Sequence, residues 1–205
     1  MKRMNILLLA CACSLMFISC QKELSMDSSL GLQGTSSLVG NWKFVGMHTK
    51  TQSIVEISDG IDILKSVTVS EYYSKNNTGT VVIDDSKMTG TNIGFEVDTV
   101  ATAFTYENNV LVNTLSAPFS FIALPTNSVS PYVRVSQDSL YFSGGFFASG
   151  SGSSTAAAPV GAKFQVKDDK IHLTYRITDF RVEDVMGLRQ TKNQSAITII
   201  TYQKQ

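Results

Sequence analysis

The chain contains 205 residues, of which 43% are hydrophobic and 17% are charged, and its 17 basic side chains balance 17 acidic ones. A domain of this size buries roughly two-thirds of its unfolded surface, so it can fold around a hydrophobic core without a disulfide framework. No basic patch or arginine run stands out, which argues against nucleic acid as a partner.

The N-terminal residues have the features of a secretory signal that ends at a lipid-attachment site. A basic start precedes an uncharged apolar run over residues 6–17, which is shorter than the about 20 residues that a membrane-spanning helix needs. Ser19 and Cys20 then resemble the cleavage junction of bacterial lipoproteins, in which the cysteine thiol receives the lipid. We therefore expect residues 1–19 to be removed as a signal peptide and Cys20 to be acylated.

This interpretation places the protein at the bacterial outer membrane, anchored by the lipid on Cys20, on a face that the sequence leaves open. The other two cysteines, Cys11 and Cys13, would leave with the signal. The mature chain would then have no disulfide, no thiolate metal site and no cysteine nucleophile. Residues 20–37 are rich in small polar residues and indicate a flexible tether, which leaves residues 38–205 as the folded domain.

The first convincing strand covers about residues 39–49 and contains Gly40 and Trp42. The glycine lets the chain bend sharply into the strand, and the indole can fill the narrow end of a barrel while its N–H finds a partner. This Gly-x-Trp pattern resembles the opening motif of the lipocalins and of small bacterial lipoproteins with lipocalin-like domains. The resemblance implies an up-and-down antiparallel barrel with the tryptophan at its closed end.

Residues 51–66 give mixed signals. Aliphatic residues between positions 54 and 64 have helix-like spacing, whereas Asp59 and Gly60 favour a turn. We expect a short strand or loop here, followed by one or two helical turns from about Ile61.

Most of the remaining chain is predicted to form strands separated by turns, one of them at residues 76–79. Two hairpins stand out because alternating segments flank short polar turns; they join residues 132–135 to 140–142 and residues 163–167 to 171–177. Further strands are expected over residues 67–73, 80–83, 90–106, 110–112, 119–124 and 196–202.

Two later segments do not follow the strand pattern. Residues 148–161 consist mostly of Gly, Ser and Ala, which bury little surface, so we expect this segment to be mobile. Residues 178–193 read as irregular, and the spacing of Val182, Val185 and Met186 predicts a short helix that stops at Gly187.

The pattern as a whole predicts an all-β protein. Roughly nine to eleven strands alternate with turns and not with helices, which excludes a parallel sheet with helical crossovers. Together with the Gly-x-Trp resemblance, this predicts an antiparallel, up-and-down, lipocalin-like barrel over residues 38–205. An antiparallel β-sandwich is the alternative.

Nothing in the sequence points to catalysis. The two histidines, His48 and His172, fall on separate predicted strands, whereas metal ligands cluster. Neighbouring acids at positions 84–85, 168–169 and 183–184 lie in predicted turns or loops, where Asp commonly supports local hydrogen bonds. No nucleophile, zinc, phosphate or calcium motif is present. We therefore expect a protein that is not an enzyme and that carries no cofactor and no metal.

Two functions stay open at this stage. One is the binding of a small apolar ligand inside the barrel, and the other is a non-enzymatic interaction or structural role with an interior filled by the protein's own side chains. The residues that we predict to line a ligand site are Phe95, Val97, Phe104, Phe142, Leu173 and Tyr175.

Overall fold

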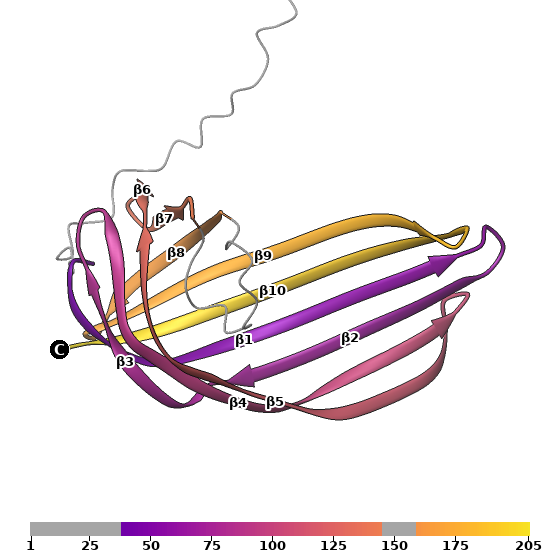
Figure 1. Ribbon diagram of the computed structural model, residues 1–205, viewed down its shortest axis with the longest axis horizontal. Coiled ribbons are helices and arrows are strands. Elements are labelled where there is room, and N and C mark those ends of the chain that lie inside the picture. Colours follow the sequence, from indigo (N-terminus) through magenta and orange to yellow (C-terminus); the bar gives the residue numbers. More distant parts are fainter. Residues whose placement is uncertain (1–37, 145–158) are drawn as a thin grey trace, which may run out of the picture. The chain divides into compact units, whose positions relative to one another are not determined.

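The structure, a computed structural model, describes residues 38–144 and 159–205, which lie in one unit spanning Ser36–Gln205. The predicted signal peptide, the lipidation site at Cys20, the tether and most of residues 148–161 lie outside the described residues. Within them, all regular structure is β (Figure 1). The strands are β1 (Gly40–Ser58), β2 (Ile63–Tyr73), β3 (Lys75–Ile83), β4 (Lys87–Glu107), β5 (Val110–Pro131), β6 (Val133–Ser136), β7 (Ser139–Phe142), β8 (Val160–Lys167), β9 (Lys170–Val185) and β10 (Leu188–Lys204).

The strands form one antiparallel sheet that meanders up and down. β2 and β3 both pair with β1 on one side and with β4 on the other, so they are successive parts of one line. The break between them is at Ser74, whose N–H donates to the Met47 carbonyl at 2.8 Å. β5 follows β4, and β10 returns to pair with β1 after β6 to β9. This confirms the predicted all-β antiparallel class, and the arrangement is compatible with a barrel or a sandwich.

β5 and β6 follow each other in the chain but lie at opposite ends of the sheet, because none of the pairings within the described residues joins them. Tyr132 lies between the two strands. Its N–H donates to the Ser86 carbonyl, and its hydroxyl donates to the Asp84 carbonyl. These bonds fix the start of β6 against the β3–β4 turn, where the sheet curls (Figure 1).

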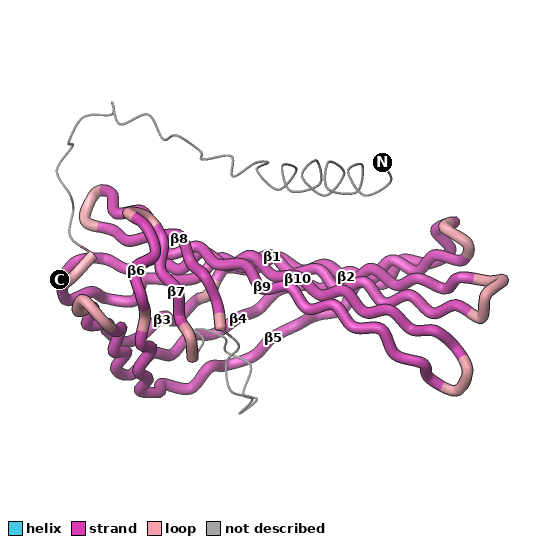
Figure 2. The backbone as a smooth tube through the Cα atoms, turned by 90° about the horizontal axis from the view of Figure 1, so that it is seen from above, coloured by secondary structure: helices cyan, strands magenta, loops and turns pink. Residues whose placement is uncertain are grey.

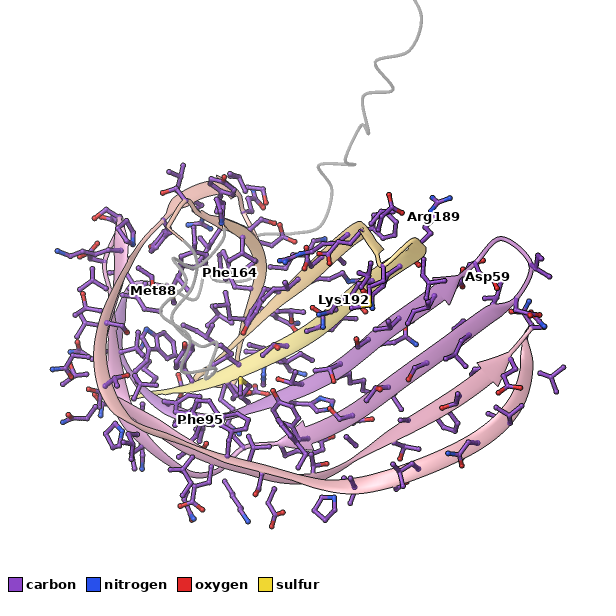
Figure 3. All side chains as sticks on the ribbon, turned by 45° about the vertical axis from the view of Figure 1, so that its right-hand side comes forward. Asp59, Met88, Phe95, Phe164, Arg189 and Lys192 are labelled. Atoms are coloured by element: carbon purple, nitrogen blue, oxygen red, sulfur yellow. The ribbon has the colours of Figure 1, made fainter. Side chains whose placement is uncertain are left out.

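The hydrophobic core lies where the sheet curls around the first half of β1. Phe44 is at its centre, with its ring centroid 6.1 Å from those of Phe95 and Tyr202. Met88 and Phe95 lie in this curled part, whereas Asp59 and Arg189 mark hairpin tips far from it (Figure 3). The side chains that are most completely buried are Trp42, Tyr202, Phe142, Ile83, Met88, Leu140, Ile171, Leu173, Ile200, Val81 and Val97.

The second half of the sheet extends beyond this core as a single layer (Figure 2). We call this region the platform. None of its residues is fully buried, because no other described element covers either of its faces. The platform consists of residues 51–58 of β1, 63–70 of β2, 101–107 of β4, 110–117 of β5, 177–185 of β9 and 188–196 of β10.

Two helix predictions were wrong, and both fall on the platform. The turns expected from Ile61 are part of β2, and the helix expected before Gly187 is the end of β9. Met186 and Gly187 have φ angles of 53° and 82° and form the tight turn into β10. Because both faces of the platform meet solvent, burial imposes no strict two-residue alternation there, and helix-like spacing arises without a helix.

The two predicted hairpins are confirmed as β6–β7 and β8–β9. Asp168 and Asp169 form the β8–β9 turn with φ angles of 51° and 57°, as a two-residue hairpin turn requires. The turn predicted at residues 76–79 was wrong, because these residues belong to β3 and interrupt its register with bulges. Gly79 has a φ of 101°, and a Cβ there would lie 2.5 Å from the Asn92 carbonyl oxygen, so only glycine fits.

Candidate functional site

The Gly-x-Trp motif performs the structural role that its residue types predict. Gly40 has a φ of 151° at the start of β1, and Trp42 is 1% exposed. The Trp42 Nε1–H donates to the Leu38 carbonyl oxygen at 3.0 Å. The indole therefore fills the core while its one polar group is satisfied by the backbone that leads into the strand.

Five of the six predicted ligand-lining residues come together in the core, and Phe104 does not. The register between β4 and β5 is continuous from Phe95 to Thr105, so alternate residues face opposite sides of the sheet. Phe104 is nine positions after Phe95 and lies on the face opposite the core. The buried residues are Phe95, Val97, Phe142, Leu173 and Tyr175, each at most 6% exposed.

These residues belong to one buried hydrophobic cluster, which also contains Tyr202. Tyr202 is 1% exposed, and its hydroxyl has no hydrogen-bond partner within the described residues. Burial raises the pKa of Tyr202 well above its usual range and raises the pKa of Tyr175 to about 12. Phenols are shifted in this way because low-dielectric surroundings disfavour the phenolate. At Tyr175 a hydrogen bond with Thr198 opposes part of the shift in pKa.

Open grooves occur on the face of the sheet opposite the core. One groove of about 670 Å³ is lined by apolar groups of β6 to β10, among them Leu140, Tyr141 and Ile197, with Lys163 and Arg176 also in its lining. A second groove of about 510 Å³ crosses the base of the platform over β10, β1, β2 and β4. Both are surface hollows of the sheet rather than an internal cavity.

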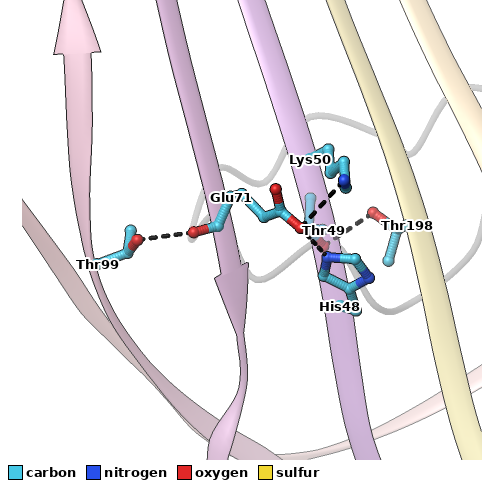
Figure 4. A network of polar contacts seen from close by, with 6 residues as sticks. All are labelled: His48, Thr49, Lys50, Glu71, Thr99 and Thr198. Carbon is cyan, nitrogen blue, oxygen red and sulfur yellow. Dashed lines mark hydrogen bonds and ion pairs between the residues drawn. The ribbon is translucent and has the colours of Figure 1, made fainter.

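A polar network lies where the curled part of the sheet meets the platform (Figure 4). A Glu71 carboxylate oxygen is 2.7 Å from His48 Nε2 and 3.1 Å from Lys50 Nζ. The hydrogen bond from His48, followed by that from Lys50, lowers the pKa of Glu71. The His48 ring stacks on Tyr73 with centroids 4.2 Å apart. The carboxylate is held ionised by hydrogen bonds from His48 and Lys50. The network therefore ties β1 to β2.

The structure does not bring the two histidines together. His48 is on β1, while His172 is on β9 and contacts the Thr201 hydroxyl through Nδ1 at 3.1 Å. Within the described residues, no three His, Cys, Asp or Glu side chains are grouped as metal ligands would be. Asp84 accepts hydrogen bonds from the backbone N–H groups of Ser86 and Lys87, which lower its pKa and hold the β3–β4 turn. The Asp84 carboxylate therefore serves local structure. The prediction that Glu183 and Asp184 lie in a turn or loop was wrong, because both belong to β9.

The two edges of the platform differ sharply in charge. β5 forms one edge, because it pairs only with β4, and its 22 residues include no Asp, Glu, Lys or Arg. β9 forms the other edge beyond Tyr175, where its pairing with β8 ends, and it carries Asp179, Arg181, Glu183 and Asp184. Large hydrophobic residues of β5 that are exposed are Val110, Leu111, Val112, Leu115, Phe119, Ile122, Leu124 and Val129.

The sequence reasoning missed this edge, although a signal was present. Residues 108–133, between Glu107 and Arg134, are the longest stretch of residues 38–205 without a charged side chain. The sequence prediction instead has two short strands here, residues 110–112 and 119–124, with Pro118 and Pro125 bounding the second. An edge strand tolerates proline, since one side of it needs no hydrogen-bond donor, so the prolines mark the edge and not the ends of strands.

No helix within the described residues is long and apolar enough to cross a membrane. Comparisons with known protein families, with curated proteins and with solved structures found no match for this chain.

Proposed function

We propose that this protein is a non-enzymatic lipoprotein of the bacterial cell envelope that presents its platform to a protein partner. The observation that carries the proposal is the division of the sheet into two parts. The curled part buries Trp42, Phe142 and Tyr202 almost completely. The platform has no core of its own, so the binding surface of the molecule lies there.

The platform keeps large hydrophobic side chains in water, most of them on its two edge strands, β5 and β9. Contiguous exposed apolar surface of this kind marks interaction sites in soluble domains. A partner that covers it would remove apolar area from water, at about 25 cal/mol per Å². The exposed residues in question are Leu64, Val110, Leu111, Val112, Leu115, Ile177, Phe180, Val182, Val185, Met186 and Leu188.

The membrane anchor is part of the proposal. The basic start, the apolar run and the Ser19–Cys20 junction support acylation of Cys20. Mass spectrometry of protein extracted from membranes should then find an acylated N-terminal Cys20. A mature chain that keeps Met1, or one with a free thiol at Cys20, would contradict the anchor.

The platform is tested by photo-crosslinking in the cell. A photoreactive phenylalanine analogue replaces Phe180, which is 66% exposed on β9, and in a second variant Leu115, which is 63% exposed on β5. We expect a discrete cross-linked protein product from at least one of these sites. Val82 of β3, 48% exposed beside the core, is the matched control and should give none. Platform sites that yield no more product than Val82 would refute the proposal.

A second candidate function is the binding of a small apolar ligand, and the groove over β6 to β10 favours it. Its apolar lining includes Leu140, Tyr141 and Ile197, a composition typical of small-molecule sites. A fluorescent fatty-acid probe separates the candidates. Saturable binding that Ile197→Asp weakens without unfolding the protein would support a ligand, whereas the interaction role predicts no saturable site.

A further inference from the structure

We propose that the uncharged edge of the platform pairs with the same edge of a second copy of this chain, so that two platforms join into one continuous antiparallel sheet. The proposal deepens the interaction role above, on which it rests, by naming the partner at one edge. The pairing segment is residues 110–117 of β5, the part of the strand before Pro118.

The edge requires a strand as its occupant. In an antiparallel pair, the backbone N–H and C=O groups of alternate residues point away from the neighbouring strand. Since β5 pairs only with β4 among the described residues, the outward groups of residues 110–117 meet no other strand. The regular part of this segment, residues 113–117 after the bulge at Val112, spans about 17 Å, which is enough for a few inter-strand hydrogen bonds. Pro118 ends the segment because it has no N–H.

The chemistry of the edge selects an uncharged strand. Sheet edges are normally protected from pairing by charged side chains, by shortness or by bulges. The β9 edge follows this rule with Asp179, Arg181, Glu183 and Asp184. β6, at the end of the curled part, has four residues and carries Arg134. Residues 110–117 carry no charge and are longer than β6, and their one interruption is a bulge at Val112, since Leu111 and Asn113 pair with the adjacent residues Tyr106 and Thr105. Their Leu and Val side chains are at least half exposed.

A second copy of β5 meets these requirements, and the other described edges do not. Pairing β5 with the β9 edge of another copy would bring four charged residues beside an uncharged apolar strand and remove their water. When two β5 segments pair with each other, neither brings a charged side chain into the contact. They pair antiparallel about a two-fold axis perpendicular to the sheet, which is the commonest symmetry of homo-oligomers. Each copy offers one such edge, so the assembly closes at two.

The edge is already held in the conformation that pairing needs. At the β4–β5 turn, the Asn108 side chain accepts a hydrogen bond from the Ile63 N–H and donates one to Asp62, both at 2.9 Å. The Lys65 ammonium donates to the Asn109 side chain, also at 2.9 Å. These bonds tie the turn to β2, so the start of β5 is fixed before a partner arrives. Preorganisation of this kind lowers the entropic cost of association.

The test measures the oligomeric state of the mature, full-length protein in detergent by sedimentation velocity over a wide concentration range. We expect a reversible monomer–dimer equilibrium. Leu115→Lys places a charge in the seam and should weaken the dimer at least about tenfold. Val182→Lys makes the same kind of change on the β9 edge, where Val182 is 48% exposed, and should leave the equilibrium unchanged. Equal melting temperatures would show that both variants fold.

Hydrogen exchange at high and low concentration provides a second readout. Amides of residues 110–117 should exchange more slowly when the dimer forms, and those of residues 177–185 should not change. A monomer at all concentrations, a dimer insensitive to Leu115→Lys, or open-ended oligomers would overturn the inference. A monomeric protein whose Phe180 still cross-links to a different protein in the cell would overturn the dimer and leave the proposed function standing.

Discussion

At the residue scale, Trp42 combines the largest buried ring of the protein with one satisfied polar atom. Trp42→Ala should reduce the free energy of unfolding by about 3–5 kcal/mol, because it empties the space of an indole that is 1% exposed. Trp42→Phe keeps most of the apolar volume but loses the bond to the Leu38 carbonyl, and it should cost less. Urea unfolding followed by circular dichroism measures both, since each variant lacks the only tryptophan.

An Ala variant as stable as the wild type would show that the indole is not part of the core. The wild-type protein offers an independent check, because a buried indole emits at shorter wavelength and resists aqueous quenchers. Readily quenched emission from the native protein would contradict the structure at this residue.

Tyr175 makes stability depend on alkaline pH. Its pKa is raised by burial from 10.0 to about 12 in the folded protein, so the unfolded chain loses the phenolic proton first. As pH rises from 10 towards 12, the unfolded state binds fewer protons than the folded state. The free energy of unfolding should therefore be unaffected by this group below pH 10 and fall by about 2 kcal/mol by pH 12.

Urea unfolding at several pH values tests this dependence. Tyr175→Phe should make the decline above pH 10 shallower, while Tyr141→Phe, at a residue that is 42% exposed, should leave it unchanged. Tyr202 is expected to add to the decline, since burial raises its pKa as well. An identical decline in the wild type and in the Tyr175→Phe variant would contradict a buried phenol at position 175.

At the element scale, the β9–β10 turn is encoded less favourably than the others. Met186 has a φ of 53°, a left-handed conformation that Asn adopts much more readily than Met, and its side chain is 99% exposed. Met186→Asn would create the Asn-Gly pair preferred in such turns. We expect the variant to gain about 0.5–1 kcal/mol, measured by urea unfolding.

Asn108, in the β4–β5 turn, already has a left-handed φ of 50°, and Asn108→Met should lose stability by a similar route. Asn108→Met should change the free energy of unfolding by more than Met186→Asn does, because the Asn108 side chain also forms hydrogen bonds with Ile63 and Asp62. A Met186→Asn variant that is less stable than the wild type would show that the turn has a different conformation.

The elements that the sequence predicted well combine a buried face with residues that favour a tight turn. The β8–β9 hairpin shows both, because Ile171, Leu173 and Tyr175 alternate with polar residues and Asp168-Asp169 marks the turn. The second half of β9 has neither a buried face nor a polar turn, and it was predicted as a helix. Tertiary pairing with β10, sixteen register partners long, decides its conformation, and no local signal encodes that pairing.

The candidate site was predictable only in part for a related reason. Five core residues were identified as inward-facing because hydrophobic residues on strands usually are. Their role was left open, since the space between them depends on how far the sheet curls. Phe104 was assigned to the inner face while residues 90–106 were open to being two strands or one bent strand. In β4 the chain runs on without a break from Phe95, so alternation places Phe104 on the other face.

At the scale of the whole molecule, the described residues form one continuous sheet with two different sources of stability. Hydrogen bonds between strands run along both halves of β1, which pairs with β10 throughout and with β3 or β2 on its other side. Side-chain burial changes along β1, because Trp42, Phe44 and Met47 are in the core and residues 51–58 are not. Backbone pairing is thus shared by the two halves, while hydrophobic burial belongs to one.

This difference predicts that the platform opens without the rest of the protein. Native-state hydrogen exchange should find that amides of residues 42–49 of β1 exchange only through global unfolding. Amides of residues 51–58 in the same strand should exchange at least about tenfold faster, because fewer buried apolar contacts oppose local opening. Strand pairing alone would favour the opposite result, because residues 51–58 pair with both β10 and β2, whereas residues 44–47 have register partners only on β10. Added denaturant should accelerate the core segment more steeply, as its opening exposes more surface. Equal protection along β1, with equal denaturant dependence, would show that platform and core unfold as one unit and would contradict separate opening of the platform.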